Sequence, residues 1–227
     1  MFIFPFDFTF ILLIPALILA FYAQGKVRNT YTALSKKKAK AGLLGYEIGQ
    51  RLVAMLGLDL GIEEIPGALT DHYDPRKEVL RLSQAVARGD SIADYSIVAH
   101  EVGHALQKRD RYPAFNLRSV LVPAASLGSQ LAFPLFFIGL IFYLPTLMDI
   151  GIIFFSLAVL FQLVTLPVEY NASSRAYAVL AQTGLIQEEE KPAVKKMLNA
   201  AALTYVAATA MAALQLLRLV LLRGARD

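Results

Sequence analysis

The sequence predicts a mainly α-helical membrane protein with a small α+β part outside the bilayer. Of its 227 residues 56% are hydrophobic and only 18% are charged, and the mean hydropathy is +0.52. This composition is too apolar for an ordinary soluble domain. Four long uncharged runs supply most of the apolar residues, and one sizeable polar segment lies between the first two runs.

Each uncharged run is close to the length of a membrane-spanning helix, which needs about 20 apolar residues. The runs cover residues 8–25, 119–148, 150–168 and 197–217. For any single run the alternative is a buried core helix. That alternative is strongest for the Ala-rich fourth run, so whether it crosses the bilayer completely stays open here. The predicted segments are an anchor over 1–25, a cytoplasmic region over 26–118, a membrane hairpin over 119–168, a second cytoplasmic segment over 169–198 and a membrane helix over 199–222.

The charges beside these runs predict the orientation. The N-terminal "MFIFPFDF" has an Asp and no Lys or Arg, so the first run is read as an uncleaved anchor and not as a signal peptide. Basic residues that follow a membrane helix tend to stay in the cytoplasm, and here they are Lys26, Arg28, Lys36, Lys37, Lys38 and Lys40. The 145–148 connection has no basic residue and is expected outside. Arg218, Arg223 and Arg226 disagree with this rule if the fourth run spans.

These features predict a multi-pass protein of the bacterial cell (inner) membrane whose polar segments face the cytoplasm. The net charge of +4 comes from loops beside the membrane, where it suits contact with anionic lipid. No basic stripe with interleaved aromatic residues is present, so nucleic acid is not an expected partner. The absence of cysteine excludes disulfides and thiolate metal ligands.

The polar segment predicts a helix, a few strands and a second helix. Apolar residues at helical spacing favour a helix over 32–61, with Gly57 as its terminator. Period-two alternation, broken at Pro66-Gly67 and Asp74-Pro75, then predicts two or three short strands. Ser91 followed by Asp94 resembles a capping box, so a helix is expected from about 92 to 109.

The second helix contains "VAHEVGHALQ", which holds two of the three histidines of the chain. His100 and His104 differ by a rise of ~6 Å and an angle of ~40°, so both imidazoles point from one face toward a single ion. This is the His-Glu-x-x-His pattern of zinc metalloproteases, in which Glu101 is the general base toward a water that zinc activates. We expect Gly103 to keep the helix surface low where metal and substrate approach.

A catalytic zinc takes three protein ligands, so a third one is needed. Glu169 directly follows the third apolar run and is the only acidic residue between Asp149 and Glu188. Pro167 favours a helix start, which would place Glu169 in a first turn at the membrane surface. The membrane hairpin would then return Glu169 beside the metal helix. The alternative is a glutamate that complements a helix dipole. Glu188, Glu189 and Glu190 are read as a solvated charge run.

Several separated motifs together resemble one known family. "TDHYDPRKEVLRLS", "VAHEVGHALQ", "LPVEYNASSRA" and "AALTYVAA", in this order, are similar to the YugP-type membrane zinc metallopeptidases, or neutral zinc metallopeptidases. The resemblance covers nearly the whole chain. It implies a gluzincin with a zincin-like cytoplasmic part, in which His100, His104 and Glu169 bind Zn²⁺ and Glu101 is the base. The more distantly similar HtpX-type proteases have an aspartate where this chain has Ser173.

Four further residues are candidates for supporting roles. His72 lies just before the strand "EVLRL" and could donate to the oxyanion of the transition state. The alternative is a turn histidine bonded to Asp74 or to backbone. Asn171, Ser173 and Arg175 are candidates to orient the metal ligands or to hold substrate.

The leading functional prediction is a membrane-bound zinc endopeptidase that cleaves membrane-associated or misfolded proteins at the cytoplasmic face. One alternative is an intramembrane site-two-type protease, which would bury the metal helix in the bilayer; here charged residues bracket that helix. Another is a non-catalytic zinc-binding scaffold or chaperone, for which Glu101 would have no use. The expected partners are protein or peptide substrates and the lipid bilayer.

Overall fold

The computed structural model describes residues 8–225, which are mainly helical and include one three-stranded sheet. The chain divides into two compact units. The helical unit comprises described residues up to Ala23, then Asn116–Pro167 and the part from Thr204 onward. The mixed unit comprises Gln24–Phe115 and Val168–Leu203. The fold class predicted from the sequence is therefore confirmed, whereas the division into five topological segments stays a prediction.

Four helices among the described residues are long and apolar enough to cross a membrane. The first combines the 3₁₀-helix η1 (Phe8–Leu13) with α1 (Ile14–Leu34), and the others are α5 (Pro113–Ile141), α6 (Pro145–Gln182) and α7 (Lys191–Gly224). The Ala-rich fourth run, whose ability to cross the bilayer is left open by its composition, lies within a 34-residue helix. Residues 1–7 of the predicted anchor lie outside the described residues.

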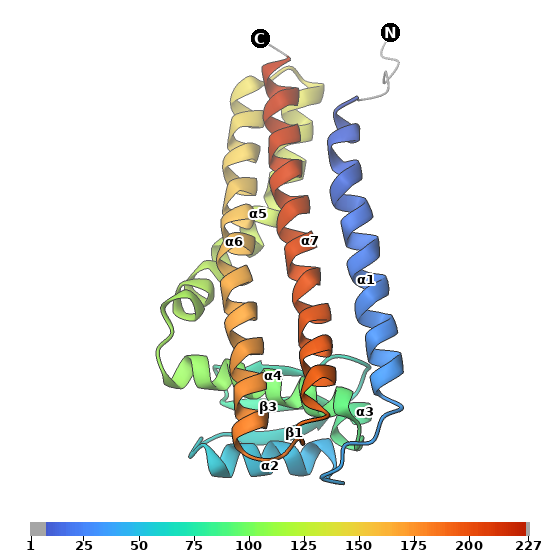
Figure 1. The fold of residues 1–227 in the computed structure, drawn as a ribbon. Helices are drawn as coiled ribbons and strands as arrows, with labels where there is room; N and C mark the ends of the chain where they lie inside the picture. Colours follow the sequence, from blue (N-terminus) through green and yellow to red (C-terminus); the bar gives the residue numbers. More distant parts are fainter. Residues whose placement is uncertain (1–7, 226–227) are drawn as a thin grey trace. The chain divides into compact units, whose positions relative to one another are not determined.

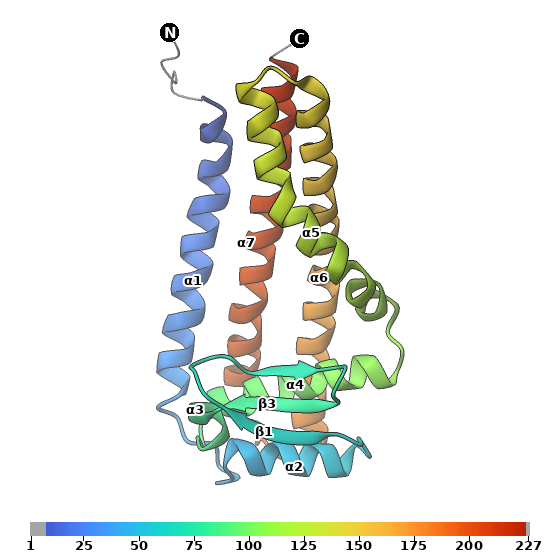
Figure 2. The same cartoon turned by 180° about the vertical axis from the view of Figure 1, so that it is seen from behind.

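Helices α5 and α6 form the predicted hairpin, and their parts within the helical unit run beside α7 (Figures 1 and 2). The turn between them is at 142–144 and not at 145–148, because Pro145 begins α6. Proline suits a first helical position, where no backbone N–H is needed. A Cβ on Gly151 would lie 2.8 Å from the Ala132 carbonyl oxygen, so glycine lets the two helices approach closely. The shared core contains Ala132, Phe136, Met148, Phe155, Val159 and Leu219.

Two of the arginines that disagree with the expected orientation have partners inside the helical unit. Arg223 Nε donates to Asp149 Oδ1 at 2.8 Å. The guanidinium of Arg218 lies 3.7 Å from the centre of the Phe10 ring, and its Nε donates to Thr9 Oγ1 at 3.2 Å. These contacts offset the cost of placing arginine near the end of a membrane helix. Arg226 lies outside the described residues.

Helix α6 continues through Pro167, so the helix start predicted there is wrong. Proline removes one backbone hydrogen bond, which neighbouring groups can compensate in membrane helices. Glu169 therefore lies in the interior of a 38-residue helix. The alternative interpretation of Glu169, as an N-terminal glutamate that complements a helix dipole, is therefore also wrong.

In the mixed unit a small sheet packs with helices α2 (Gly45–Met55), α3 (Gln84–Ala87) and α4 (Ile92–Arg109). The strands are β1 (Gly61–Ile65), β2 (His72–Asp74) and β3 (Val79–Ser83), which confirms the predicted short strands. Their order is β1-β3-β2, with β1 parallel and β2 antiparallel to β3. Strand β2 is thus an edge of this sheet, and Figure 2 shows the strands beside α4.

Of the predicted helix over 32–61, only 32–34, at the end of α1, and Gly45–Met55 are helical. The segment after Leu34 leaves the helix to pair with the start of α4: Ala39 N–H donates to Asp90 O and Ile92 N–H to Lys37 O. Gly42 has a φ of +66°, which ends any helical continuation. Helix α2 then begins at Gly45, and Gly57, with a φ of +60°, follows its end as expected.

The core of the mixed unit fixes α4 among the other elements. Ser91 Oγ accepts from Asp94 N–H and Asp94 Oδ2 accepts from Ser91 N–H, which confirms the capping box. The fully buried Tyr95 donates its hydroxyl hydrogen to the carbonyl oxygen of Leu43. Tyr95 belongs to one apolar cluster with side chains from α2, β3, α4, α6 and α7, among them Ile48, Leu52, Leu80, Leu82, Val98, Leu180 and Leu198.

Candidate metal centre and active site

The structure brings together His100 and His104 of α4 and Glu169 of α6, all within the mixed unit. Glu169 Oε2 lies 3.2 Å from His100 Nε2 and 3.6 Å from His104 Nε2. One ligand atom from each residue lies within 4.8 Å of the others. Residues separated by 69 positions in sequence thus meet at one point.

These three side chains fit a zinc ion. Ligand atoms about 2.0–2.2 Å from zinc and at tetrahedral angles are roughly 3.3–3.6 Å apart, close to the two measured separations. Glu169 is only 1% exposed, and a buried carboxylate needs a cation or strong hydrogen bonds beside it. Two imidazoles and one carboxylate are also a ligand set that catalytic zinc uses.

Gln107 fixes the orientation of His104, a role that the sequence reading missed. Its side-chain Nε2 donates to the Val168 carbonyl oxygen at 2.7 Å and to Asn171 Oδ1 at 3.0 Å. Its Oε1 therefore faces His104 Nδ1, at 2.9 Å, and accepts a hydrogen from it. This leaves the lone pair of His104 Nε2 directed at the metal group. Gln107 stands three residues after His104, on the same helix face, and that spacing could have indicated it.

The three polar candidates on α6 lie around the same group. Ser173 Oγ is 3.3 Å from His100 Nδ1, which makes it the neighbour of the other imidazole. Asn171 Oδ1 accepts from Arg175 Nε at 2.8 Å as well as from Gln107. Arg175 also forms an ion pair with Asp110, just after the end of α4. These contacts connect α6 to α4 at His100 and beyond His104, and the functional roles of the three residues stay predictions.

Glu101 is buried next to the histidines and is held by the edge strand. Its Oε2 accepts the backbone N–H of Tyr73 in β2 at 2.9 Å. Burial raises the pKa of Glu101 to about 7, while His100 and the Tyr73 N–H act in the opposite direction. A carboxylate that exchanges a proton near neutral pH suits a general base.

Gly103 has a different role from the one expected. A Cβ at this position would lie 2.5 Å from the Ala172 carbonyl oxygen of α6. No side chain other than hydrogen fits between the two helices there. Gly103 therefore allows the close approach of α4 and α6, which in turn brings Glu169 to the histidines.

The remaining candidates lie apart from the group. His72, the first residue of β2, is exposed, and its Nδ1 is 2.8 Å from the Thr70 carbonyl oxygen. Glu188 and Glu189 are exposed and pair with lysines, as expected of a charge run. Glu190 is not solvated: it is 4% exposed, and its carboxylate accepts the backbone N–H groups of Lys40 and Gln187.

Comparison with known proteins identifies the family. A family described as "Putative neutral zinc metallopeptidase" matches residues 9–224. The chain belongs to this family of zinc metallopeptidases, which confirms the resemblance seen in its motifs. It is 46% identical over 212 residues to the "Putative membrane protease YugP" of Bacillus subtilis (strain 168). The aligned residues cover 93% of this chain and 94% of that relative. No solved structure matches the chain.

Proposed function

We propose that this protein is a zinc-dependent endopeptidase of the membrane, a gluzincin in which His100, His104 and Glu169 hold the metal and Glu101 is the general base. The meeting of three ligand atoms within 4.8 Å, with a buried carboxylate at the next helix position, is the observation that carries the proposal. Family membership supports zinc as the metal and a peptide bond as the target.

Each residue has a distinct task in this proposal. When bound, zinc supplies a Lewis acid that polarises the scissile carbonyl and makes water more acidic. Glu101 accepts a proton from the attacking water, while the Tyr73 N–H bonded to its Oε2 holds the carboxylate in place. It then delivers that proton to the nitrogen of the leaving amine. Gln107 keeps His104 in the tautomer that directs Nε2 toward the metal. A role for His72 as a donor to the oxyanion stays a prediction; its Nδ1 lies 2.8 Å from the Thr70 carbonyl oxygen, as in the backbone-bonded alternative.

The proposed substrates are membrane-associated or misfolded proteins, cleaved on the cytoplasmic side. Four helices suited to the bilayer support a membrane location. The charged end of α4, with Lys108, Arg109 and Asp110, favours a site outside the hydrocarbon over an intramembrane one. The substrate class follows by analogy with HtpX-type proteases.

The decisive experiment compares zinc content and proteolysis in the purified full-length protein. The wild type and Glu101→Gln are expected to hold one zinc ion per chain, whereas His100→Ala, His104→Ala and Glu169→Ala lose most of it. Cleavage by Glu101→Gln should fall by about 10²–10⁴-fold, the usual contribution of general acid–base catalysis. Glu188→Gln, an exposed matched control, should leave both zinc and cleavage unchanged.

Two outcomes would overturn the proposal in different ways. Undiminished cleavage by Glu101→Gln would remove the assigned base. Zinc bound at the three ligands without proteolysis by the wild type would favour the scaffold function instead.

A further inference from the structure

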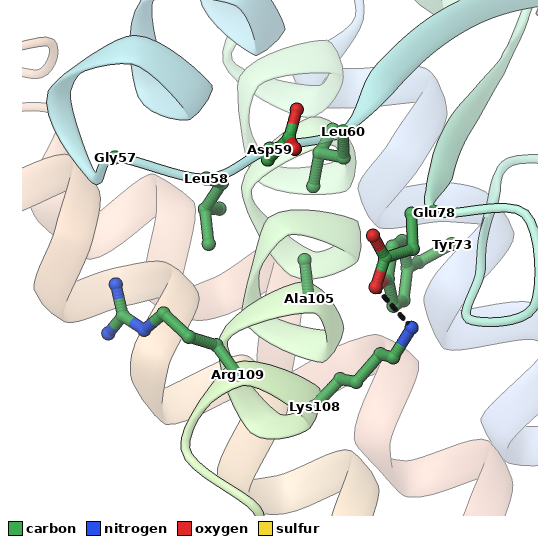
Figure 3. Close-up of a pocket in the computed structure, with 9 residues that line it drawn as sticks. All are labelled: Gly57, Leu58, Asp59, Leu60, Tyr73, Glu78, Ala105, Lys108 and Arg109. Carbon is green, nitrogen blue, oxygen red and sulfur yellow. Dashed lines mark hydrogen bonds and ion pairs between the residues drawn. The ribbon is translucent and has the colours of Figure 1, made fainter.

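A pocket of about 270 Å³ opens on the mixed unit, beside Ala105 and Lys108 of α4 (Figure 3). One wall is the 57–60 segment between α2 and β1, and another is Tyr73 of β2. Ala105, Lys108 and Arg109 of α4 line the third side. The volume is just below the usual range of about 300–1,000 Å³ for pockets that take a whole small-molecule ligand, so it suits one large side chain.

The pocket begins one helical turn from the proposed base. Glu101, Ala105 and Lys108 are spaced by four and three residues and so share one face of α4. Tyr73 connects the two places directly, because it lines the pocket while its N–H donates to Glu101 Oε2 at 2.9 Å. A peptide whose scissile bond lies at Glu101 therefore has this pocket within reach of an adjacent residue.

Strand β2 also shows on which side of the sheet the pocket lies. Tyr73 pairs with Leu80, and both contact the apolar core on the same side of the sheet. Cross-strand neighbours point to the same face of a sheet. Tyr73 also lines the pocket, so the pocket opens on that face of β2, next to the Tyr73 N–H that holds Glu101.

The lining selects an apolar side chain over a charged one. Leu58, Leu60 and Ala105 point into the middle of the pocket (Figure 3). Both cations of the lining are already bonded: Lys108 Nζ contacts Glu78 Oε1 and the Pro75 carbonyl oxygen, each at 2.5 Å. Arg109 donates to the Leu56 carbonyl oxygen at 3.1 Å and to Asp110 at 2.9 Å. Asp59 and Glu78 also balance the charge of these two cations. The lining therefore offers no unpaired positive charge to an acidic side chain of a substrate.

We propose that this pocket determines cleavage specificity by taking a bulky apolar side chain, such as Leu, Met or Phe, from a residue next to the scissile bond. The inference rests on the proposed peptidase function and adds the chemistry of its substrate. Ala105 is the residue that sets the depth of the pocket, because it is small and only 3% exposed at the centre of the lining.

The test maps cleavage sites in a peptide library with the zinc-loaded, full-length protein and follows them with matched Leu and Ala peptides. The wild type should favour bulky apolar residues at one position beside the cleaved bond. Ala105→Phe fills the pocket and should lower the Leu-to-Ala ratio of kcat/KM by about tenfold or more, as expected when an apolar pocket loses its space. Leu58→Ala enlarges it and should raise the relative cleavage of Trp-containing peptides. Ala68→Phe adds the same ring on an exposed loop and should change neither preference.

Zinc content and circular dichroism establish that each variant is folded. If Ala105→Phe does not fold, the cleavage preference of Leu58→Ala alone tests the proposed role of the pocket. Suppose that the folded pocket variants cleave in a Glu101-dependent way with the same preference for bulky apolar residues as the wild type. That result would overturn this inference. Cleavage that persists in Glu101→Gln would instead overturn the proposed function, so the two failures can be told apart.

Discussion

The orientation of His104 depends on a single neighbour, Gln107, which is fully buried. Three hydrogen bonds use both ends of its amide, to His104, Val168 and Asn171. An amide held at both ends cannot rotate freely, so it restricts the imidazole that it contacts. Such a residue contributes to metal affinity without touching the metal.

Replacement of Gln107 by Leu keeps the volume but removes the acceptor for His104 Nδ1–H. We expect zinc affinity to fall by about 10–100-fold, the usual effect of losing a partner of a metal-binding histidine. Competition with a chromophoric zinc chelator measures this. Gln50→Leu, on the exposed side of α2, is the matched control and should leave the affinity unchanged. An unaltered affinity in a folded Gln107→Leu protein would contradict the role assigned to Gln107.

At the residue scale, spacing alone was enough to indicate His100, Glu101 and His104, because helix geometry puts positions four apart on one face. Glu169 was chosen as an isolated acidic residue after an apolar run, and the structure brings it to the histidines. The partners Tyr73 and Gln107 were missed. A backbone N–H such as that of Tyr73 carries no signal in sequence, since every residue except proline has one.

At the scale of elements, the site depends on how closely α4 and α6 approach. Gly103 and Ala172 are in close contact, with room for only a hydrogen on Gly103. The ion pair between Asp110 and Arg175 and the Gln107 hydrogen bonds connect the same two helices. Packing and polar contacts therefore act together to hold Glu169 opposite the histidines.

Gly103→Ala should separate the two helices, because the clash is with a backbone carbonyl that cannot move aside as a side chain can. Overpacking of this kind costs about 1–3 kcal/mol of stability, and the zinc affinity should fall with it. Thermal denaturation and zinc titration measure the two effects. Gly25→Ala, in α1, meets no atom within 4 Å and should be neutral or slightly stabilising, since Ala is the better helix former. Full zinc affinity in Gly103→Ala would show that this contact does not position Glu169.

Elements with a clear local signal were predicted well, and those set by distant contacts were not. Helix α4 agrees with its predicted bounds because a capping box begins it. The 36–44 segment has helical periodicity but pairs with the residues that precede and begin α4, and such pairing cannot be read from local sequence. Pro167 by itself favours a helix start, but α6 continues through it, as a long helix can. The order β1-β3-β2 likewise depends on tertiary packing.

For the whole molecule, the predicted orientation is best tested by chemistry that the chain itself permits. It contains no cysteine, so single introduced thiols report without background. Lys36 lies after α1 and Leu144 lies in the turn between α5 and α6, and both are exposed. The basic residues after α1 predict a cytoplasmic location for Lys36.

In intact cells, an impermeant thiol reagent should label Leu144→Cys and leave Lys36→Cys unlabelled until the membrane is permeabilised. Immunoblotting after mass-tag labelling quantifies both. The reverse pattern would invert the orientation, including that of the proposed active site.

The ligand set has a consequence for the synthesis of the protein. His100 and Glu169 are 69 residues apart, and most of the hairpin of α5 and α6 lies between them. A nascent chain that has exposed α4 alone therefore offers a metal the two imidazoles but not the Glu169 carboxylate. The proposed centre can be completed only after the ribosome has released the second helix of the hairpin. Under the proposed function, a chain made in this order has no complete centre until both helices of the hairpin have been synthesised, so no proteolysis is expected before that stage.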